Sequence, residues 1–288
     1  MNISDVLYAP DEGFDLNLPV VTKKFYTDSE SNPIQIVFLG DIHIGAKVTD
    51  EAFVEKIAER LKKPNTYWVD MGDACEMINM QDKRFNIRDV AEWAVNLDGL
   101  VDLPKMQMER YAEIFKPVAD RCICRVKGNH EDMMVVRQER DVYKELANKC
   151  GISKSTFLGY SGFLRLVCQV KCKNGQRKGG WTVTGYLTHG HGGGKLAGGK
   201  ALNLERLALA YDADFYAFAH THTKMHIEKR MIACDRTMAY DKLKCAFIVG
   251  SCRRGISSYE KRAGYYPQGL GPYELWIWPE SKKMKLIG

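Results

Sequence analysis

The sequence predicts a mixed α/β fold (α/β or α+β) whose chemically active side chains lie at the ends of strands. Three short apolar runs, rich in β-branched and aromatic residues, are each followed by Gly-Asp or Gly-Asn, as is typical of buried strands that lead into sharp turns. Segments with apolar residues at helical spacing separate these runs, whereas the second half contains mostly strand-like segments. This order indicates layers of sheet and helix with the functional residues at one sheet edge.

The first half of the chain alternates strands and helices. Its first strand is IQIVFL at residues 34–39, which Gly40 and Asp41 follow. The first helix covers residues 51–61, where apolar side chains recur every three or four positions before Pro64. The other elements predicted here are a strand at 66–71, a helix at 105–118 and a strand at 122–126.

The second half is predicted to add a further sheet. A glycine-rich loop at 192–200 and a helix at 201–210 interrupt its strands, which are predicted at 163–170, 181–187, 215–219, 225–231, 244–249 and 274–278. We expect a single domain over residues 1–288, with a first βαβ half at about 33–150 and a β-rich half at about 151–288. Residues 77–102 are polar with intermittent apolar positions, which is compatible with an insertion over the active site.

The composition is that of a globular protein, with 45% hydrophobic and 27% charged residues. No apolar stretch approaches the roughly 18 residues of a membrane span. The N-terminus has no apolar run after a basic start, so we expect no membrane segment, no signal peptide and a cytoplasmic location. The nine cysteines, an odd number without a CxxC pair, are then expected to be reduced thiols. The net charge of +6 is compatible with a polyanionic substrate without requiring one.

Five of the seven histidines stand at or just beyond the ends of predicted strands, three of them beside Asp or Asn. A single histidine in such a place is usually structural, but this concentration is hard to obtain by accident. Glycine before an acid lets the chain turn so that the side chain points into a crevice. Carboxylate, imidazole and amide oxygen together suit divalent ions such as Mn²⁺, Fe²⁺ or Zn²⁺. The clusters are Gly40-Asp41-Ile42-His43, Gly72-Asp73-Ala74-Cys75-Glu76, Gly128-Asn129-His130-Glu131 and Ala219-His220-Thr221-His222, with His189 alone after a strand.

These blocks, in this order, resemble the calcineurin-like metallophosphoesterase superfamily, whose signature is D-x-H, G-D-x-x-D/E, G-N-H-D/E, H and G-H-x-H. The resemblance spans roughly residues 40–222. It implies a four-layer β-sandwich flanked by helices, with the metal site on loops at the carboxyl ends of strands. It also implies two divalent metal ions, Mn²⁺ first, with Fe, Zn, Ni or Mg as alternatives. The implied ligands are Asp41, His43 and His222 for one ion, Asn129, His189 and His220 for the other, and Asp73 as the bridge.

The resemblance further implies a hydrolase of phosphate esters, in which hydroxide held between the two ions attacks phosphorus. His130 is expected to protonate the leaving oxygen, since its neighbour Asn129 is committed to a metal. In relatives, an acid three residues after the bridging Asp orients this histidine. Glu76 holds that position here and is one methylene longer than the more familiar Asp. Glu131 is expected to be structural, and Ala219 stands where Gly is usual.

The second block favours the phosphodiesterase and exonuclease branch over the phosphoprotein phosphatases, because Glu76-Met77-Ile78 replaces their Asp-Arg-Gly run and the chain ends H-x-H. We therefore expect a phosphodiester substrate in DNA, RNA or a nucleotide, with a phosphomonoester or a phosphoprotein as the alternative. Mixed basic and aromatic residues suit backbone phosphates and stacked bases, although a solvated surface explains them equally well. These residues are Lys83, Arg84, Arg88, the turn at 171–178, Arg253, Arg254, Lys261 and Arg262, with Tyr259, Tyr265, Tyr266 and Tyr273.

A competing site lies at residues 194–201, GKLAGGKA, one residue short of the phosphate-binding loop G-x-x-x-x-G-K-[ST]. The missing hydroxyl would have held the Mg²⁺ of a nucleotide, and a nucleotide triphosphatase would leave the acid–histidine clusters without a purpose. We expect instead a loop that passes close to the metals, with Lys195 or Lys200 touching substrate phosphate, and a flexible, solvated loop is an equally open alternative. A binding scaffold without chemistry is the non-enzymatic alternative, disfavoured because every ligand position is filled.

Overall fold

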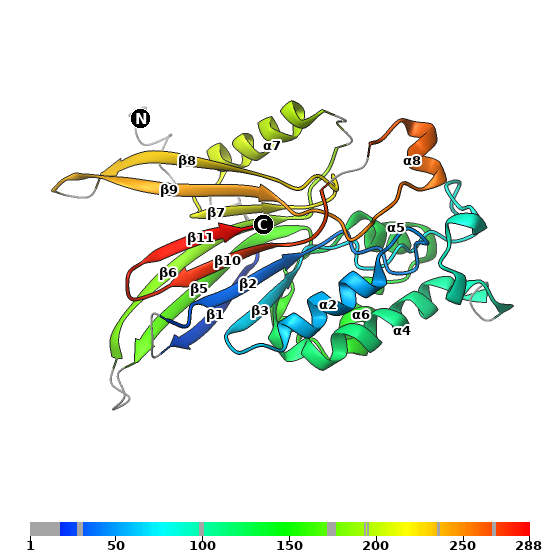
Figure 1. Ribbon diagram of the computed structural model, residues 1–288, viewed down its shortest axis with the longest axis horizontal. Helices are drawn as coiled ribbons and strands as arrows, with labels where there is room; N and C mark the ends of the chain where they lie inside the picture. Colours follow the sequence, from blue (N-terminus) through cyan, green and yellow to red (C-terminus); the bar gives the residue numbers. More distant parts are fainter. Residues whose placement is uncertain are drawn as a thin grey trace, which may run out of the picture.

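Two sheets form the centre of the molecule (Figure 1). The computed structural model describes residues 18–27, 31–97, 101–171, 177–192, 194, 196–234, 237–266 and 269–288. The five-stranded sheet has the order β11 (Lys283–Ile287), β10 (Tyr273–Trp278), β2 (Ile34–Leu39), β3 (Thr66–Asp70) and β4 (Cys122–Arg125). The six-stranded sheet has the order β1 (Val20–Thr27), β5 (Ser161–Lys171), β6 (Arg177–Thr188), β7 (Phe215–Phe218), β9 (Ala239–Ile248) and β8 (Met225–Cys234).

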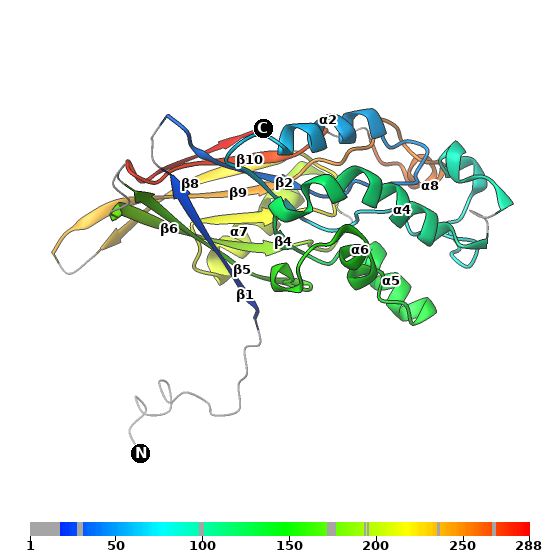
Figure 2. The ribbon, with the colours of Figure 1, turned by 90° about the horizontal axis from the view of Figure 1, so that it is seen from below.

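Helices cover the outer faces of both sheets. Figure 1 shows α7 on one side of the sheets and α2, α4 and α6 grouped on the other, and Figure 2 gives the perpendicular view. The α-helices are α2 (Glu51–Leu61), α4 (Leu103–Phe115), α5 (Asn129–Gln138), α6 (Val142–Cys150), α7 (Ala197–Ala210) and α8 (Ser258–Ala263). Single turns of 3-10 helix lie at Ile87–Asp89, Glu92–Ala94 and Lys154–Thr156, and a longer one at Lys116–Arg121.

Three layers of apolar packing hold this arrangement together. Phe38 and Phe215 belong to the core between the two sheets, and their rings meet edge to face with centroids 5.5 Å apart. Trp68 on the opposite face of the five-stranded sheet packs against α2, α4 and α6, and Leu204 of α7 packs on the six-stranded sheet. The order of layers is helix, sheet, sheet, helix, which confirms the four-layer sandwich expected from the sequence.

Local signals set the limits of the helices. The helix predicted at 105–118 begins at Leu103, because the Asp102 side chain accepts the main-chain N–H of Lys105 at 3.0 Å. It ends at Phe115, since Pro117 cannot donate to an α-helical ladder and the chain tightens into a 3-10 turn. The helix at 51–61 has the predicted limits, and Asp50 caps it.

The second sheet differs from the prediction. The strand predicted at 274–278 belongs to the first sheet, where β10 pairs antiparallel with β2. The reason is that the inward side chains Leu275 and Ile277 are fully buried in the core beside the β2 residues. β1 was not predicted and joins the six-stranded sheet in parallel with β5. The two halves of the chain therefore exchange strands. Also unpredicted are β11, α5, α6 and α8.

The described part of the chain adds two further facts. None of its helices has the length and apolar character needed to cross a membrane. Its eight cysteines are unpaired, and all but Cys234 are buried. Cys172 lies outside the described residues.

A buried ion pair ties β3 to β4 and yields a first prediction. Arg125 Nε donates to Asp70 Oδ2 at 2.9 Å, and each side chain is 1% exposed. Arg125→Ala should lower the free energy of unfolding by about 3–5 kcal/mol, because the buried Asp70 carboxylate loses its partner. Urea denaturation measures this loss. Arg230→Ala, which removes an exposed pair with Asp241, should cost less than about 1 kcal/mol. Equal losses of unfolding free energy in the two variants would contradict the stabilising role assigned to the buried pair.

Candidate metal centre

The predicted site residues lie on loops at the carboxyl ends of β2, β3, β4, β6 and β7. Because β2, β3 and β4 run parallel to one another, as do β6, β7 and β9, the loops after them reach the same edge of the sandwich. Several of these residues have a left-handed backbone, which is uncommon outside glycine and persists where the surroundings enforce it. Positive φ angles between 49° and 66° occur at Asp41, His43, Asp73, His220 and His222.

Two glycines, Gly72 and Gly128, allow the loops after β3 and β4 to approach one another. Gly72 has a φ of +91°, and a Cβ there would lie 2.6 Å from the nitrogen of Gly128 and 2.8 Å from Nδ1 of His189. The buried Glu131 carboxylate then accepts three main-chain N–H groups, from Gly128 at 2.9 Å, Asp73 at 3.0 Å and Ala74 at 2.9 Å. These bonds fasten the β3 and β4 loops together, in line with the structural role expected of Glu131.

The first cluster joins Asp41, His43 and His222, whose ligand atoms lie within 4.8 Å of one another. His43 Nε2 lies 3.1 Å from His222 Nε2, which in turn lies 3.7 Å from Asp41 Oδ1. Asp41 is fully buried, and neither carboxylate oxygen has a hydrogen-bond partner among the described residues. Burial, with a smaller contribution from the Asp73 charge, raises the pKa of Asp41 to about 7. A bound cation would supply the partner that this carboxylate lacks, so the residues fit a divalent metal.

The second cluster joins Asp73, His189 and His220, again within 4.8 Å, with Asn129 among them. His189 Nε2 lies 3.2 Å from Asp73 Oδ2 and 3.0 Å from Asn129 Oδ1, and His220 Nδ1 lies 2.6 Å from the same amide oxygen. Although burial alone would lower the pKa of His189, the Asp73 carboxylate raises it to about 10. The Asp73 charge also acts on His43 of the first cluster. The structure thus assembles the seven predicted ligand residues into two adjoining groups.

His130 and Glu76 meet, but not through the atoms expected. The Nδ1 atom of His130 contacts the main-chain oxygen of Glu76, while the Glu76 carboxylate lies 2.9 Å from Nδ1 of His43. The main-chain N–H of His130 donates to Asp73 Oδ1 at 2.9 Å. Because a carbonyl oxygen only accepts, His130 carries a hydrogen on Nδ1, which leaves Nε2 free for a second partner. The ligand atoms of Glu76, His43 and His130 lie within 4.8 Å of one another.

Comparison with known proteins bears on the identity of the chain. The family model described as calcineurin-like phosphoesterase matches residues 34–224, more than half of the 288 residues. The chain belongs to this family. It is a metal-dependent phosphoesterase, and the clusters of acids and histidines are its candidates for divalent metal binding. No curated protein matches the chain.

Several solved structures are similar to this chain at low sequence identity. A conserved protein from Streptococcus pneumoniae TIGR4, described as a predicted phosphoesterase, is 11% identical, with 89% of this chain and 98% of that chain covered and a TM-score of 0.33. A Vps29 double mutant from Entamoeba histolytica is 13% identical, with 88% and 98% covered and a TM-score of 0.35. A metallophosphoesterase from Sphaerobacter thermophilus is 13% identical, with 88% and 87% covered and a TM-score of 0.36.

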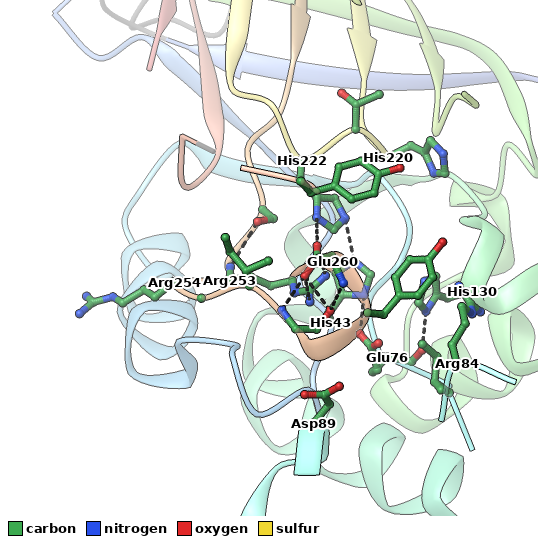
Figure 3. A pocket seen from close by; sticks show the side chains of 18 of the residues that line it. His43, Glu76, Arg84, Asp89, His130, His220, His222, Arg253, Arg254 and Glu260 are labelled. Carbon is green, nitrogen blue, oxygen red and sulfur yellow. Dashed lines mark hydrogen bonds and ion pairs between the residues drawn. The ribbon is translucent and has the colours of Figure 1, made fainter. Parts of the chain in front are cut away.

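A pocket of about 260 Å³ opens beside both clusters of this phosphoesterase, with His43, His130, His220 and His222 in its wall (Figure 3). Parts of two further segments, 76–90 and 251–270, form much of the rest of the wall. The predicted basic and aromatic residues that line it are Arg84, Arg253, Arg254, Tyr259, Tyr265 and Tyr266. Those that do not line it are Lys83, Arg88, Lys261, Arg262 and Tyr273. The side chains of the turn at 171–178 lie outside the described residues.

The glycine-rich segment does not form the loop that a nucleotide triphosphatase requires. α7 begins at Ala197, so Gly198 and Gly199 lie in the first turn of the helix. Lys200 is 5% exposed, and its Nζ donates to the main-chain oxygen of Thr221 at 3.3 Å, beside His220. It also lines the pocket. Lys195 lies outside the described residues.

Sequence reasoning missed Glu260, whose carboxylate faces His222 from α8. The signal available was Ser257 followed three residues later by Glu260, a capping box that marks the start of a helix. Of the two histidines outside the blocks, His191 is exposed and His226 contacts the Tyr273 hydroxyl at 3.2 Å. Ala219 is fully buried in the core between the sheets, so the methyl group in place of glycine is accommodated.

Proposed function

We propose that this protein is a binuclear metal-dependent phosphodiesterase that acts on nucleic acid or nucleotides, nearer the exonuclease branch than the phosphoprotein phosphatases. The observation that carries the proposal is a pocket with two acid–histidine clusters beside cationic and aromatic walls. Arg84 and Arg253 bring guanidinium groups to the wall, where Arg84 pairs with Asp82 and Arg253 with Glu260. Tyr259 and Tyr266 are aromatic side chains 45% and 70% exposed at its margin. Guanidinium groups suit phosphate oxygens, and exposed aromatic rings suit bases.

The seven ligand residues divide between the two ions as the family resemblance implies, with Asp73 shared. Mn²⁺ is our first choice, since carboxylate, imidazole and amide oxygen ligands suit it. When bound, two such ions supply the nucleophile and neutralise charge on the phosphoryl group. His130 is proposed to enter the step as an imidazolium, with one hydrogen on Nδ1 bound to the Glu76 carbonyl and one on Nε2, and to donate the Nε2 proton to the leaving oxygen.

We also propose that residues 1–288 form one domain. β1 from the start of the chain pairs with β5, and β10 from its end pairs with β2, so neither half holds a complete sheet by itself. The cytoplasmic location remains a prediction from the sequence.

A substrate panel tests the proposed function. Purified protein with Mn²⁺ is offered single-stranded DNA, duplex DNA, a cyclic nucleotide, an aryl phosphodiester, an aryl phosphomonoester and a phosphopeptide. We expect turnover of the diesters, with cleavage of DNA that declines as salt rises because phosphate contacts are electrostatic. Turnover confined to the phosphomonoester or the phosphopeptide would favour the alternative phosphatase. Folded, metal-loaded protein without any turnover would instead indicate a binding scaffold.

A further inference from the structure

The two histidines of the first cluster are arranged as a pair around one point. Their Nε2 atoms face each other at 3.1 Å, close to Asp41. Their Nδ1 atoms face away, and each meets a carboxylate: Glu76 Oε2 lies 2.9 Å from His43, and Glu260 Oε1 lies 3.8 Å from His222. Figure 3 shows the four side chains converging from separate segments of the chain.

We propose that Glu76 and Glu260 are positioning residues that hold His43 and His222 for one of two cations, the one bound with Asp41. A carboxylate behind an imidazole keeps the hydrogen on Nδ1, directs the Nε2 lone pair to the metal and strengthens it as a ligand. The inference rests on the proposed function, because it assumes a divalent ion at this cluster. It assigns Glu76 a contact with His43 in addition to His130. It also adds Glu260, which lies beyond the residues 34–224 that the family model matches.

Glu260 is held firmly enough for this purpose. The N–H and hydroxyl of Ser257 both donate to Glu260 Oε2 at 2.8 Å, as part of the cap of α8. Arg253, whose side chain is 7% exposed, grips both carboxylate oxygens through Nη1 at 3.1 Å and Nη2 at 2.7 Å. Paired donors of this kind fix the plane of the carboxylate. The 3.8 Å approach to His222 is an ion-pair distance, longer than a hydrogen bond, and the Arg253 guanidinium that pairs with Glu260 also acts on this histidine.

Glu76 reaches His43 from the loop after β3. Its side chain is 16% exposed, and its main-chain oxygen contacts Nδ1 of His130. The rings of His43 and His130 meet edge to face, with centroids 4.7 Å apart. One residue therefore touches both the proposed proton donor and a proposed metal ligand.

In the second cluster, the described residues place no carboxylate beside Nδ1 of His189 or His220, and the carboxylate that His189 contacts is the cluster's own Asp73. His189 Nδ1 lies 2.7 Å from the main-chain oxygen of Met71 instead. A neutral carbonyl orients the ring without adding a full charge. Removing the charge of Glu76 or Glu260 should therefore weaken one of the two bound ions and spare the other.

Metal titration tests the inference without reference to turnover. Mn²⁺ binding to the full chain is measured by calorimetry and by electron paramagnetic resonance, for the wild type, Glu76→Gln and Glu260→Gln. We expect two ions in the wild type, and in each variant one ion bound about 10–100-fold more weakly with the other unchanged. Ser258→Ala is the matched control, since it removes the 2.8 Å hydroxyl bond between α8 and Asp89 without touching Glu260. It should lower the melting temperature and leave both affinities intact.

The outcomes separate the two proposals. A wild-type protein that binds no divalent ion would overturn the proposed function itself. A wild type with two ions, and glutamine variants that bind both as tightly, would overturn the positioning role alone. Equal weakening of both ions in the glutamine variants, or weakening in Ser258→Ala, would also overturn it, because the effect would then reflect the folding of the loops.

Discussion

Asp73→Asn is expected to lower kcat/KM for an aryl phosphodiester by about a thousandfold, since metal ions contribute several kcal/mol to such reactions and about 1.4 kcal/mol corresponds to a factor of ten. Asp73 belongs to the second cluster, and its charge also acts on the first. No neutral side chain can balance two cations at once. Metal titration should accordingly find fewer tightly bound ions than in the wild type.

The asparagine variant is chosen because it preserves the loop. Its side-chain oxygen can still accept the N–H of His130, which Asp73 Oδ1 accepts at 2.9 Å. Asparagine also tolerates the φ of 52° found at this position. Asp132→Asn is the control, because Asp132 lies on α5 and pairs with Lys127, outside both clusters. It should retain activity and metal. Wild-type turnover with two bound ions in Asp73→Asn would contradict the bridging role.

The loops of the candidate metal ligands could be predicted because each signal is local. A buried strand shows itself as an apolar run, and the acid or histidine that follows at once must lie at the sheet edge. Asp41 after β2 and His189 after β6 are found in this way, whatever the neighbouring strands do. The same reasoning fails for β10, since an apolar alternation states which face is buried but not which strand lies beside it.

The residues of the pocket wall could not be predicted in this way, because tertiary contacts that leave little pattern in the local sequence position them. α8 has six residues, too few for an apolar period, and its contacts include hydrogen bonds from Ser258 to Asp89, 169 residues away in sequence. The direction of the Glu76 carboxylate was equally hidden. Its position in the second block predicts a contact with His130, yet its carboxylate lies 2.9 Å from Nδ1 of His43. Sequence reasoning identified Glu76 but not its contact with His43.

His130→Ala is expected to lower kcat by about 10²–10⁴-fold for substrates with poor leaving groups, the range typical of general acid catalysis. His130 lines the pocket and is 8% exposed, and its Nδ1 is already engaged by the Glu76 carbonyl. Only Nε2 is left to meet a leaving oxygen. His191→Ala is the control, since His191 is exposed and does not line the pocket, and it should leave kcat unchanged.

The dependence on the leaving group distinguishes proton donation from a structural role. An aryl oxide with a low pKa departs without a proton, whereas an alkoxide such as the sugar oxygen of DNA needs one. His130→Ala should therefore impair the alkyl diester far more than a nitrophenyl diester. The loss of the ring could also disturb His43, which it contacts edge to face, but that disturbance would slow both substrates alike. An equal loss on the two leaving groups would remove His130 from the chemical step and leave it a neighbour of the metal site.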